Sequence, residues 1–223
     1  MNKTKDPVNQ HLIDLNSKLG YAKIGLMNSA VWHEDPRRLL FTLSRYKFVA
    51  KMFEGFDTVL EVGCGDGFCS RVVKQTVKKL IITDYDPFFI QKFEDISDDQ
   101  WPIETKVHDI LLSPIEAKVD GIYSLDVFEH ILPSIEDTYF SNIAKSLNKN
   151  GSAILGSPSL ESQSYASHGS IAGHVNCKSA KDLKNTLLKY FENVFIFSMN
   201  DEVVHTGFSP MSHYNLALCV NPK

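Results

Sequence analysis

The amino-acid sequence predicts an α/β protein built around a mostly parallel sheet of seven strands, with helices on both faces of the sheet. Three observations support this fold class. From residue 57 onward, short apolar runs alternate with segments of helical periodicity, which is the pattern of strands joined by crossover helices. A glycine-rich loop directly follows the first apolar run. The last two apolar runs have no helix between them, so we expect an antiparallel strand pair at the C-terminal end.

An N-terminal helical unit, residues 1–56, is expected to precede the sheet domain, residues 57–223. Residues 1–34 are weakly patterned and predict short helices that act as a flap. A clear helix then starts, because Asp35 suits the N-cap, Pro36 suits the first helical position, and apolar residues recur at helical spacing beyond them. We expect this helix to pack on the core of the sheet domain.

Within the sheet domain, the predicted strands and helices follow in regular order. The strands are expected at residues 58–63, 79–86, 104–110, 120–127, 152–159, 193–200 and 213–220. The helices are expected at residues 68–77, 87–96, 134–151 and 180–191. Gly151 should end the third helix, and Ser179 with Asp182 forms a capping box before the fourth. A long loop rich in Ser, Gly and His, residues 160–177, follows the fifth strand.

The composition is that of an ordinary globular protein and argues against several other classes of protein. The formal net charge of −4 does not provide the basic surface expected of a nucleic-acid binder. The polar N-terminus lacks the apolar core of a signal peptide, and no apolar run approaches the ~20 residues that span a membrane. The cysteines form no zinc or C-x-x-C pattern, so we expect reduced thiols in a cytoplasmic protein.

The spacing of the glycine loop narrows the ligand that it can hold. Gly63, Gly65 and Gly67 follow the pattern G-x-G-x-G, whereas the dinucleotide fingerprint needs G-x-G-x-x-G and a P-loop needs G-K-[ST]. The loop also contains no Lys or Arg that could meet a pyrophosphate. Glycines allow positive φ and a close approach of the backbone to a ligand. The spacing therefore argues against the phosphate-binding loops.

Three acidic residues are expected to surround this loop. Glu61 precedes it on the first strand, Asp84 ends the second strand and Asp109 ends the third. In an open parallel sheet, ligands bind at the carboxyl ends of the strands. A carboxylate such as Asp84 can accept both ribose hydroxyls there, and Asp109 can accept a hydrogen bond from an adenine amino group. An acidic cleft suits a cationic ligand, and S-adenosylmethionine carries a sulfonium and an ammonium.

Five segments, taken in order, carry a resemblance to a known family: "VLEVGCGDGF", "IITDYDP", "KVHDILL", "DGIYSLDVFEH" and "LNKNGSAILGSPS". Their order and spacing resemble those of the class I S-adenosylmethionine-dependent methyltransferases, which implies a Rossmann-like sheet and S-adenosyl-L-methionine as cofactor. The resemblance also implies cofactor contacts along the strand ends: Glu61, Gly63 and Gly65 at the methionine part, Asp84 at the ribose, Tyr85, Asp109 and the Ile110 backbone at the adenine, and Leu125 with Asp126 closing the methionine end.

The segment after the fourth strand, "SLDVFEH", bears on the atom that is methylated. It is neither an N-P-P-Y loop nor a Pro-Cys nucleophile, which argues against nucleobase methylation. It resembles the small-molecule O-methyltransferases of the ubiquinone-biosynthesis type, whose E-x-x-E-H segment is associated with a divalent metal. Asp126, Glu129 and His130 stand at those positions here, with a shortened first acid. One interpretation of these three residues is a Mg²⁺ site. In the other interpretation there is no metal, Glu129 caps a helix, and His130 only packs against its neighbours.

The candidate catalytic residues are His130, His174 and Asp126. His174 lies in the Ser/Gly loop after the fifth strand, which should face the substrate side of a sheet of this topology. An imidazole there can act as a general base for the acceptor hydroxyl. A loop histidine can equally be a surface residue, so this alternative stays open.

Together these features predict an enzyme that O-methylates a small polar metabolite, such as a sugar or a surface-polysaccharide precursor. The alternatives are a protein or RNA methyltransferase, a nicotinamide-dependent oxidoreductase, and an inactive cofactor-binding module. The glycine spacing and the lack of a Tyr-x-x-x-Lys pair argue against the oxidoreductase, and the acidic balance argues against RNA. The intact cofactor motifs argue against the inactive module. The expected partner is a small-molecule acceptor, and the oligomeric state is left open.

Overall fold

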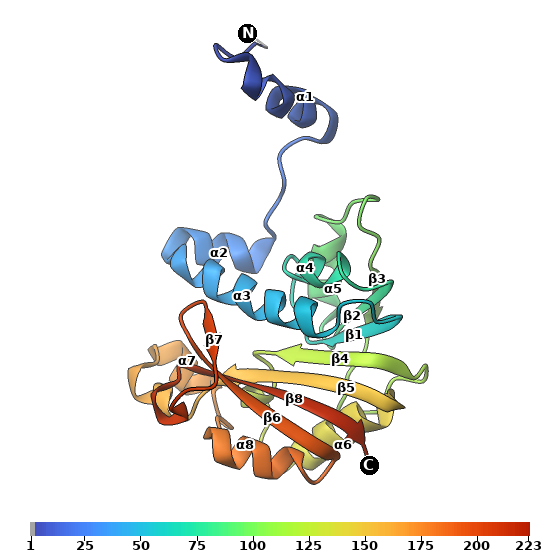
Figure 1. The fold of residues 1–223 in the computed structure, drawn as a ribbon, viewed down its shortest axis with the longest axis vertical. Coiled ribbons are helices and arrows are strands. Elements are labelled where there is room, and N and C mark those ends of the chain that lie inside the picture. Colours follow the sequence, from blue (N-terminus) through green and yellow to red (C-terminus); the bar gives the residue numbers. More distant parts are fainter. Residues whose placement is uncertain (1–2) are drawn as a thin grey trace.

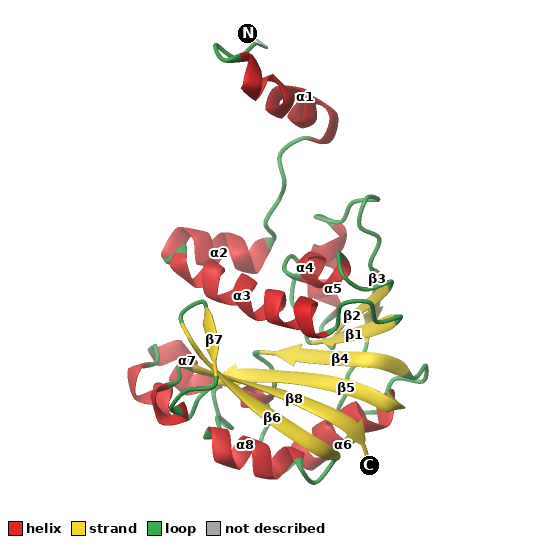
Figure 2. Cartoon of the chain, viewed as in Figure 1, coloured by secondary structure: helices red, strands yellow, loops and turns green. Residues whose placement is uncertain are grey.

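The computed structural model describes residues 3–223, so residues 1 and 2 of the expected N-terminal unit lie outside the described residues. Its centre is one sheet of eight strands in the order β3-β2-β1-β4-β5-β8-β6-β7 (Figures 1 and 2). The strands are β1 (Thr58–Val62), β2 (Lys79–Asp84), β3 (Glu104–Val107), β4 (Val119–Leu125), β5 (Leu147–Pro158), β6 (Phe191–Asn200), β7 (Val203–His205) and β8 (Tyr214–Pro222).

The pairing of the strands confirms the predicted Rossmann-like α/β class. Strands β1 to β5 are parallel wherever they pair with one another, and β8 runs antiparallel between β5 and β6. The predicted antiparallel C-terminal pair is therefore β6 with β8. One strand was not expected: β7 folds back on the end of β6 in a segment that the sequence predicts as loop.

Helices cover both faces of the sheet, as predicted. They are α1 (Gln10–Leu19), α2 (Leu26–Glu34), α3 (Arg37–Met52), α4 (Ser70–Lys74), α5 (Pro87–Glu94), α6 (Glu136–Ser146), α7 (His168–Gly173) and α8 (Ala180–Leu187), with short 3-10 turns η1 (Pro7–Asn9), η2 (Phe128–His130), η3 (Glu161–Tyr165) and η4 (Ser209–Met211). Leu60 and Val62 of β1 pack in the core beneath α6 and α8. Val59, which precedes Leu60 and so points to the opposite face of the strand, packs on the other side with α3, α4 and α5.

The N-terminal helices differ in how they join this body. In Figure 1, η1 and α1 lie apart from the sheet, and neither buries a residue. Helix α3 buries Tyr46, Phe48, Val49 and Ala50 in the core, so it packs on the sheet domain. No helix within residues 3–223 is long and apolar enough to cross a bilayer.

The boundary between α6 and β5 corrects one prediction. The sequence predicts a helix to residue 150 that ends at Gly151, but α6 ends at Ser146 and β5 starts at Leu147. Ser146 Oγ accepts a hydrogen bond from Ile115 N at 2.9 Å and donates one to the Asn142 carbonyl at 2.7 Å, which fixes the helix end inside the core. The next residues bulge out of register with β4 before Ser152 resumes the pairing. The exposed bulge is polar, so its pattern looked like a continued helix.

Candidate functional site

The glycine loop after β1 has the tight backbone that its sequence predicts. Gly63, Gly65 and Gly67 all have positive φ, at 76°, 54° and 68°. The Gly63 N–H donates to the Thr83 carbonyl of β2 at 2.8 Å. A Cβ on Gly63 would lie 2.4 Å from Val127 Cγ2, so the loop leaves no room for a side chain at this position. Glycine is needed here for both conformation and space.

The acid at the end of β2 is joined to this loop. Asp84 Oδ2 accepts a hydrogen bond from Gly65 N at 3.0 Å, and Oδ1 accepts one from Asp86 N at 3.0 Å. Asp84 is 6% exposed, and this burial raises the pKa of its carboxyl despite the backbone donors. Tyr85 beside it is 72% exposed, so its ring is not part of the core. Asp86 caps α5 by accepting from Phe88 N at 2.9 Å.

The third strand brings Asp109 and Ile110 to the same edge of the sheet. Strand β3 ends at Val107, so Asp109 stands in the turn that follows, where Oδ1 accepts from Leu111 N at 2.8 Å. Ile110 is buried, and its carbonyl accepts from Asn142 Nδ2 at 2.7 Å. Because β2 and β3 are adjacent and Asp84 pairs with Val107, both predicted nucleoside-binding acids lie near the same strand ends.

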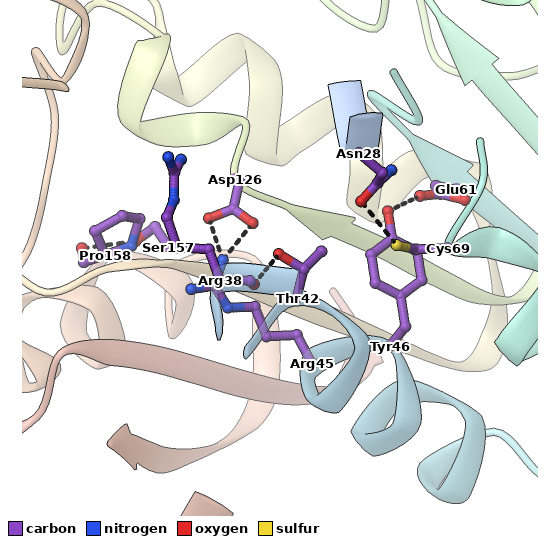
Figure 3. A network of polar contacts seen from close by, with 10 residues as sticks. All are labelled: Asn28, Arg38, Thr42, Arg45, Tyr46, Glu61, Cys69, Asp126, Ser157 and Pro158. Atoms are coloured by element: carbon purple, nitrogen blue, oxygen red, sulfur yellow. Dashed lines mark hydrogen bonds and ion pairs between the residues drawn. The ribbon is translucent and has the colours of Figure 1, made fainter. Parts of the chain in front are cut away.

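Glu61 lies buried beside the glycine loop, among hydroxyl groups. Its carboxylate is 1% exposed and accepts hydrogen bonds from Tyr46 Oη at 2.6 Å, from Tyr123 Oη at 2.6 Å and from Ser70 Oγ (Figure 3 shows the first). Burial raises the pKa of Glu61 although the three hydroxyls oppose the shift. The side chain thus ties α3, α4 and β4 together beside the loop. Its contact with the methionine part of a cofactor stays a prediction.

Beyond the end of β4, Asp126 is held by a residue that the sequence analysis did not assign to it. Leu125 is buried, and Asp126 has a φ of 57°, unusual for a residue with a side chain. Arg45 of α3 places Nη1 at 2.9 Å from Oδ1 and 2.7 Å from Oδ2 of Asp126 (Figure 3). The guanidinium carbon lies 3.8 Å from the centre of the Tyr214 ring. No local sequence pattern connects these residues, because they come from three distant elements.

Glu129, His130 and His174 come together on the far side of this segment. One potential ligand atom from each residue lies within 4.8 Å of the other two. The His130 and His174 rings meet edge-on with centroids 5.2 Å apart. The Glu129 carbonyl accepts from the N–H groups of Val175 and Asn176 at 2.8 and 3.0 Å, which holds the loop of residues 160–177 against η2. The structure therefore unites two histidines that the sequence offered as separate candidates.

This cluster combines a buried carboxylate with an exposed histidine, His130, and a partly buried one, His174. Glu129 is 1% exposed, and neither of its carboxylate oxygens has a hydrogen-bond partner. Burial, together with the nearby Asp126, raises the pKa of Glu129 well above its ordinary value. Partial burial and the neighbouring His130 lower the pKa of His174. Such a group of imidazoles and a carboxylate can accept a proton or hold a cation.

The other late histidines have partners elsewhere. His205 Nε2 lies 2.7 Å from Asn200 Oδ1, and His213 Nδ1 lies 3.7 Å from Asp201 Oδ1. His168 is the first residue of α7. Within residues 3–223, neither they nor any cysteine joins a group of potential metal ligands.

Comparisons with known proteins agree with this architecture. A family model described as a methyltransferase domain matches residues 31–191. Among curated proteins, none matches the sequence significantly. The N-methyltransferase NodS from Bradyrhizobium japonicum WM9, solved with S-adenosyl-L-homocysteine, has a TM-score of 0.62 and 22% identity, covering 86% of this chain and 92% of that chain.

Two further solved structures are similar over most of their length. An S-adenosylmethionine-dependent methyltransferase from Clostridium acetobutylicum ATCC 824 has a TM-score of 0.65 and 13% identity, covering 86% of this chain and 96% of that chain. The DhpI–SAM–HEP complex has a TM-score of 0.63 and 11% identity, covering 97% of this chain and 99% of that chain. These likenesses show a shared fold.

Proposed function

The chain belongs to the methyltransferase-domain family that matches its residues 31–191, and on that premise we propose that it transfers the methyl group of S-adenosyl-L-methionine to a hydroxyl of a small polar acceptor. The acceptor class that we favour is a sugar or a surface-polysaccharide precursor. One observation carries the proposal: the Asp84 carboxylate and the Gly65 backbone form a hydrogen-bonded unit at the carboxyl edge of the parallel sheet.

The cofactor would lie along this edge. The glycine loop lets its backbone approach the methionine part, and Asp84 accepts hydrogen bonds from the ribose hydroxyls. The exposed ring of Tyr85 can cover the adenine, whose amino group reaches Asp109. The acidic groups along the strand ends favour a ligand that carries a sulfonium and an ammonium.

Methyl transfer from a sulfonium is an in-line displacement at carbon. The acceptor oxygen forms a bond to the methyl carbon while the carbon–sulfur bond breaks, and its electron pair stays on sulfur as a thioether. The hydroxyl proton must leave, and an imidazole of His130 or His174 can accept it. Orientation of the two reactants can contribute ~7–11 kcal/mol, and a general base can add ~10²–10⁴-fold to the rate.

The same cluster also fits a divalent cation, because Glu129 offers two buried carboxylate oxygens without partners and two histidines lie beside it. Glu129, His130 and His174 would hold the ion. When bound, it would polarise the acceptor hydroxyl and lower its pKa. Without an ion, an imidazole of the cluster would take the hydroxyl proton; with an ion held by both imidazoles, the more acidic hydroxyl would release its proton to water.

We propose further that residues 1–56 form an N-terminal unit in which α2 covers the cofactor edge. Met27 at the start of α2 supports this, because its N–H donates to Asp66 Oδ2 of the glycine loop at 2.7 Å. Its sulfur also lies 2.6 Å from the position that a Cβ on Gly65 would take. Helix α2 therefore already touches the loop that the cofactor is expected to approach.

Two measurements test the proposed function. Thermal melting with S-adenosyl-L-methionine, S-adenosyl-L-homocysteine or NAD should show stabilisation by the first two, since a ligand that binds the folded state raises the melting temperature. Stabilisation by NAD alone would refute the cofactor. Incubation with methyl-labelled cofactor and separated sugar, lipid and protein fractions should then label a small polar product. Label found only in protein or RNA would refute the acceptor class.

A further inference from the structure

We infer that the metal centre of this chain has a substituted ligand set, in which Glu129, His130 and His174 bind the ion and Asp126 does not. This set should select a transition-metal dication such as Zn²⁺ or Mn²⁺ over Mg²⁺. The inference deepens the proposed function at the same site and rests on it only for the use of the ion in methyl transfer. Ion binding itself can be measured without any cofactor or acceptor.

Asp126 is withheld from the centre by Arg45. Both carboxylate oxygens of Asp126 face the same guanidinium nitrogen, at 2.9 and 2.7 Å, and Arg45 is fixed in turn on the Tyr214 ring. The Arg45 side chain is 18% exposed and the Asp126 side chain 37% exposed, so the pair is partly buried. Turning Asp126 toward a metal would leave the mostly buried guanidinium without its acid, and this loss opposes ligation by Asp126. The ion pair therefore disfavours ligation by Asp126.

Glu129 supplies the anionic ligand. A buried carboxylate is normally paired or hydrogen-bonded, because leaving its oxygens without donors is costly. Both Glu129 oxygens lack a partner, while the backbone carbonyl of the same residue is bonded twice by the loop of residues 160–177. The side chain is thus held in place by its backbone with its oxygens available. A dication beside the two histidines would satisfy them.

Each of the two histidines has an oxygen acceptor at its Nδ1. His130 Nδ1 lies 2.9 Å from the Gly173 carbonyl, and His174 Nδ1 lies 2.8 Å from Gln163 Oε1. Because both partners are oxygen acceptors, each Nδ1 carries the proton and each Nε2 keeps its lone pair. Such outer contacts fix the tautomer and direction of ligating histidines. His174 thereby takes the place that the sequence had assigned to the first acid.

The change of ligands changes the preferred ion. Mg²⁺ prefers an oxygen shell, whereas two imidazole nitrogens with one carboxylate suit Zn²⁺, Mn²⁺ and Fe²⁺. Three protein ligands also leave coordination positions open for an acceptor oxygen. The affinity order expected from this donor set is Zn²⁺ above Mn²⁺, with Mg²⁺ weakest.

Titration calorimetry of the metal-free, full-length protein with ZnCl₂, MnCl₂ or MgCl₂ alone tests this assignment. We expect one Zn²⁺ or Mn²⁺ per chain, with Mg²⁺ at least ~100-fold weaker than Zn²⁺. His174→Ala should weaken Zn²⁺ binding by at least ~10-fold, since a ligand contributes no less than the outer contacts that typically account for ~10–100-fold. His168→Ala, in the same loop, should leave Zn²⁺ affinity unchanged, and Asp126→Asn should weaken it less than His174→Ala does. Circular dichroism of each metal-free variant confirms that it is folded.

The outcomes separate this inference from the proposed function. Mg²⁺ binding as tight as Zn²⁺, no Zn²⁺ binding, or a loss of affinity in Asp126→Asn but not in His174→Ala would overturn the ligand set even if methyl transfer is found. The expected Zn²⁺ pattern without any binding of S-adenosyl-L-methionine would leave the ligand set standing and refute the methyltransferase proposal.

Discussion

The backbone N–H of Gly65 donates a 3.0 Å hydrogen bond to Oδ2 of Asp84, which joins the glycine loop after β1 to the acid at the end of β2. The two predicted cofactor-binding features are therefore one unit. A change at either residue should affect both the shape of the loop and the charge that faces the ribose.

Replacing Asp84 with Asn should weaken the binding of S-adenosyl-L-homocysteine by ~10–100-fold. Hydrogen bonds to a charged group contribute ~1.5–3 kcal/mol, and 1.4 kcal/mol corresponds to a factor of ten. Titration calorimetry measures the affinity. Asp86→Ala is the matched control, because it removes the cap of α5, at a cost of ~1 kcal/mol in stability, and keeps the backbone N–H that donates to Asp84. Equal affinity losses in both variants would contradict the role of Asp84.

Gly63→Ala should destabilise the fold more than Gly55→Ala. Both glycines have positive φ, which costs roughly 1–2 kcal/mol for a residue with a side chain. A Cβ on Gly63 would also collide with Val127, adding ~1–3 kcal/mol of overpacking, whereas a Cβ on Gly55 meets nothing within 4 Å. Urea unfolding of the two variants compares them. Equal losses of stability would show that the loop can shift to make room for a Cβ at Gly63.

His130→Ala and His174→Ala should each lower kcat by at least ~10-fold while leaving the affinity for S-adenosyl-L-homocysteine near that of the wild type. Both residues serve removal of the acceptor proton in the proposed mechanism, and such catalysis typically contributes ~10²–10⁴-fold. Steady-state rates with an identified acceptor measure the effect. His168→Ala controls for disturbance of the loop. Wild-type rates in both cluster variants would place proton removal elsewhere.

Glu61 should make stability fall as pH rises above about 4.5, the ordinary pKa of its carboxyl. Burial raises the pKa of folded Glu61, so above this pH the folded chain keeps a proton that the unfolded chain has lost, and the proton-binding difference favours unfolding. Glu61→Gln removes this titration and should narrow the stability difference between pH 5 and pH 8. Parallel urea-unfolding profiles for both proteins would contradict the assignment.

Local sequence patterns were sufficient for most of the fold. The strands from β1 to β6 and β8, the cap at Asp86 and the Ser179–Asp182 capping box all follow from short-range periodicity and capping chemistry, and the structure confirms them. The end of α6 at Ser146 was missed, because the hydrogen bond that Ser146 accepts from Ile115 is long-range. Strand β7 was missed because three residues are too few to show a period.

The candidate site was predictable only in part, for the same reason. Some of its residues could be placed from the sequence because they stand at or just after the ends of predicted strands. These are Gly63, Gly65, Asp84 and Asp109, and they lie at one edge of the sheet. The link between Arg45 and Asp126 joins a helix before the sheet to a strand end, and no spacing rule encodes it. The conformation of the loop of residues 160–177 brings His174 to His130. The polar sequence of this loop shows neither helix nor strand periodicity, so its conformation could not be predicted.

The most direct test of the central claim is carbon NMR of the wild-type protein incubated with [methyl-¹³C]-S-adenosyl-L-methionine and a metabolite fraction of small polar compounds. The carbon shift of the transferred methyl distinguishes a bond to oxygen from a bond to nitrogen or sulfur. The account predicts a new methoxy carbon in a small molecule, formed together with S-adenosyl-L-homocysteine and strongly reduced with Asp84→Asn. A methyl carbon on nitrogen, on protein or on RNA, or no transfer by protein that binds the cofactor, would contradict it.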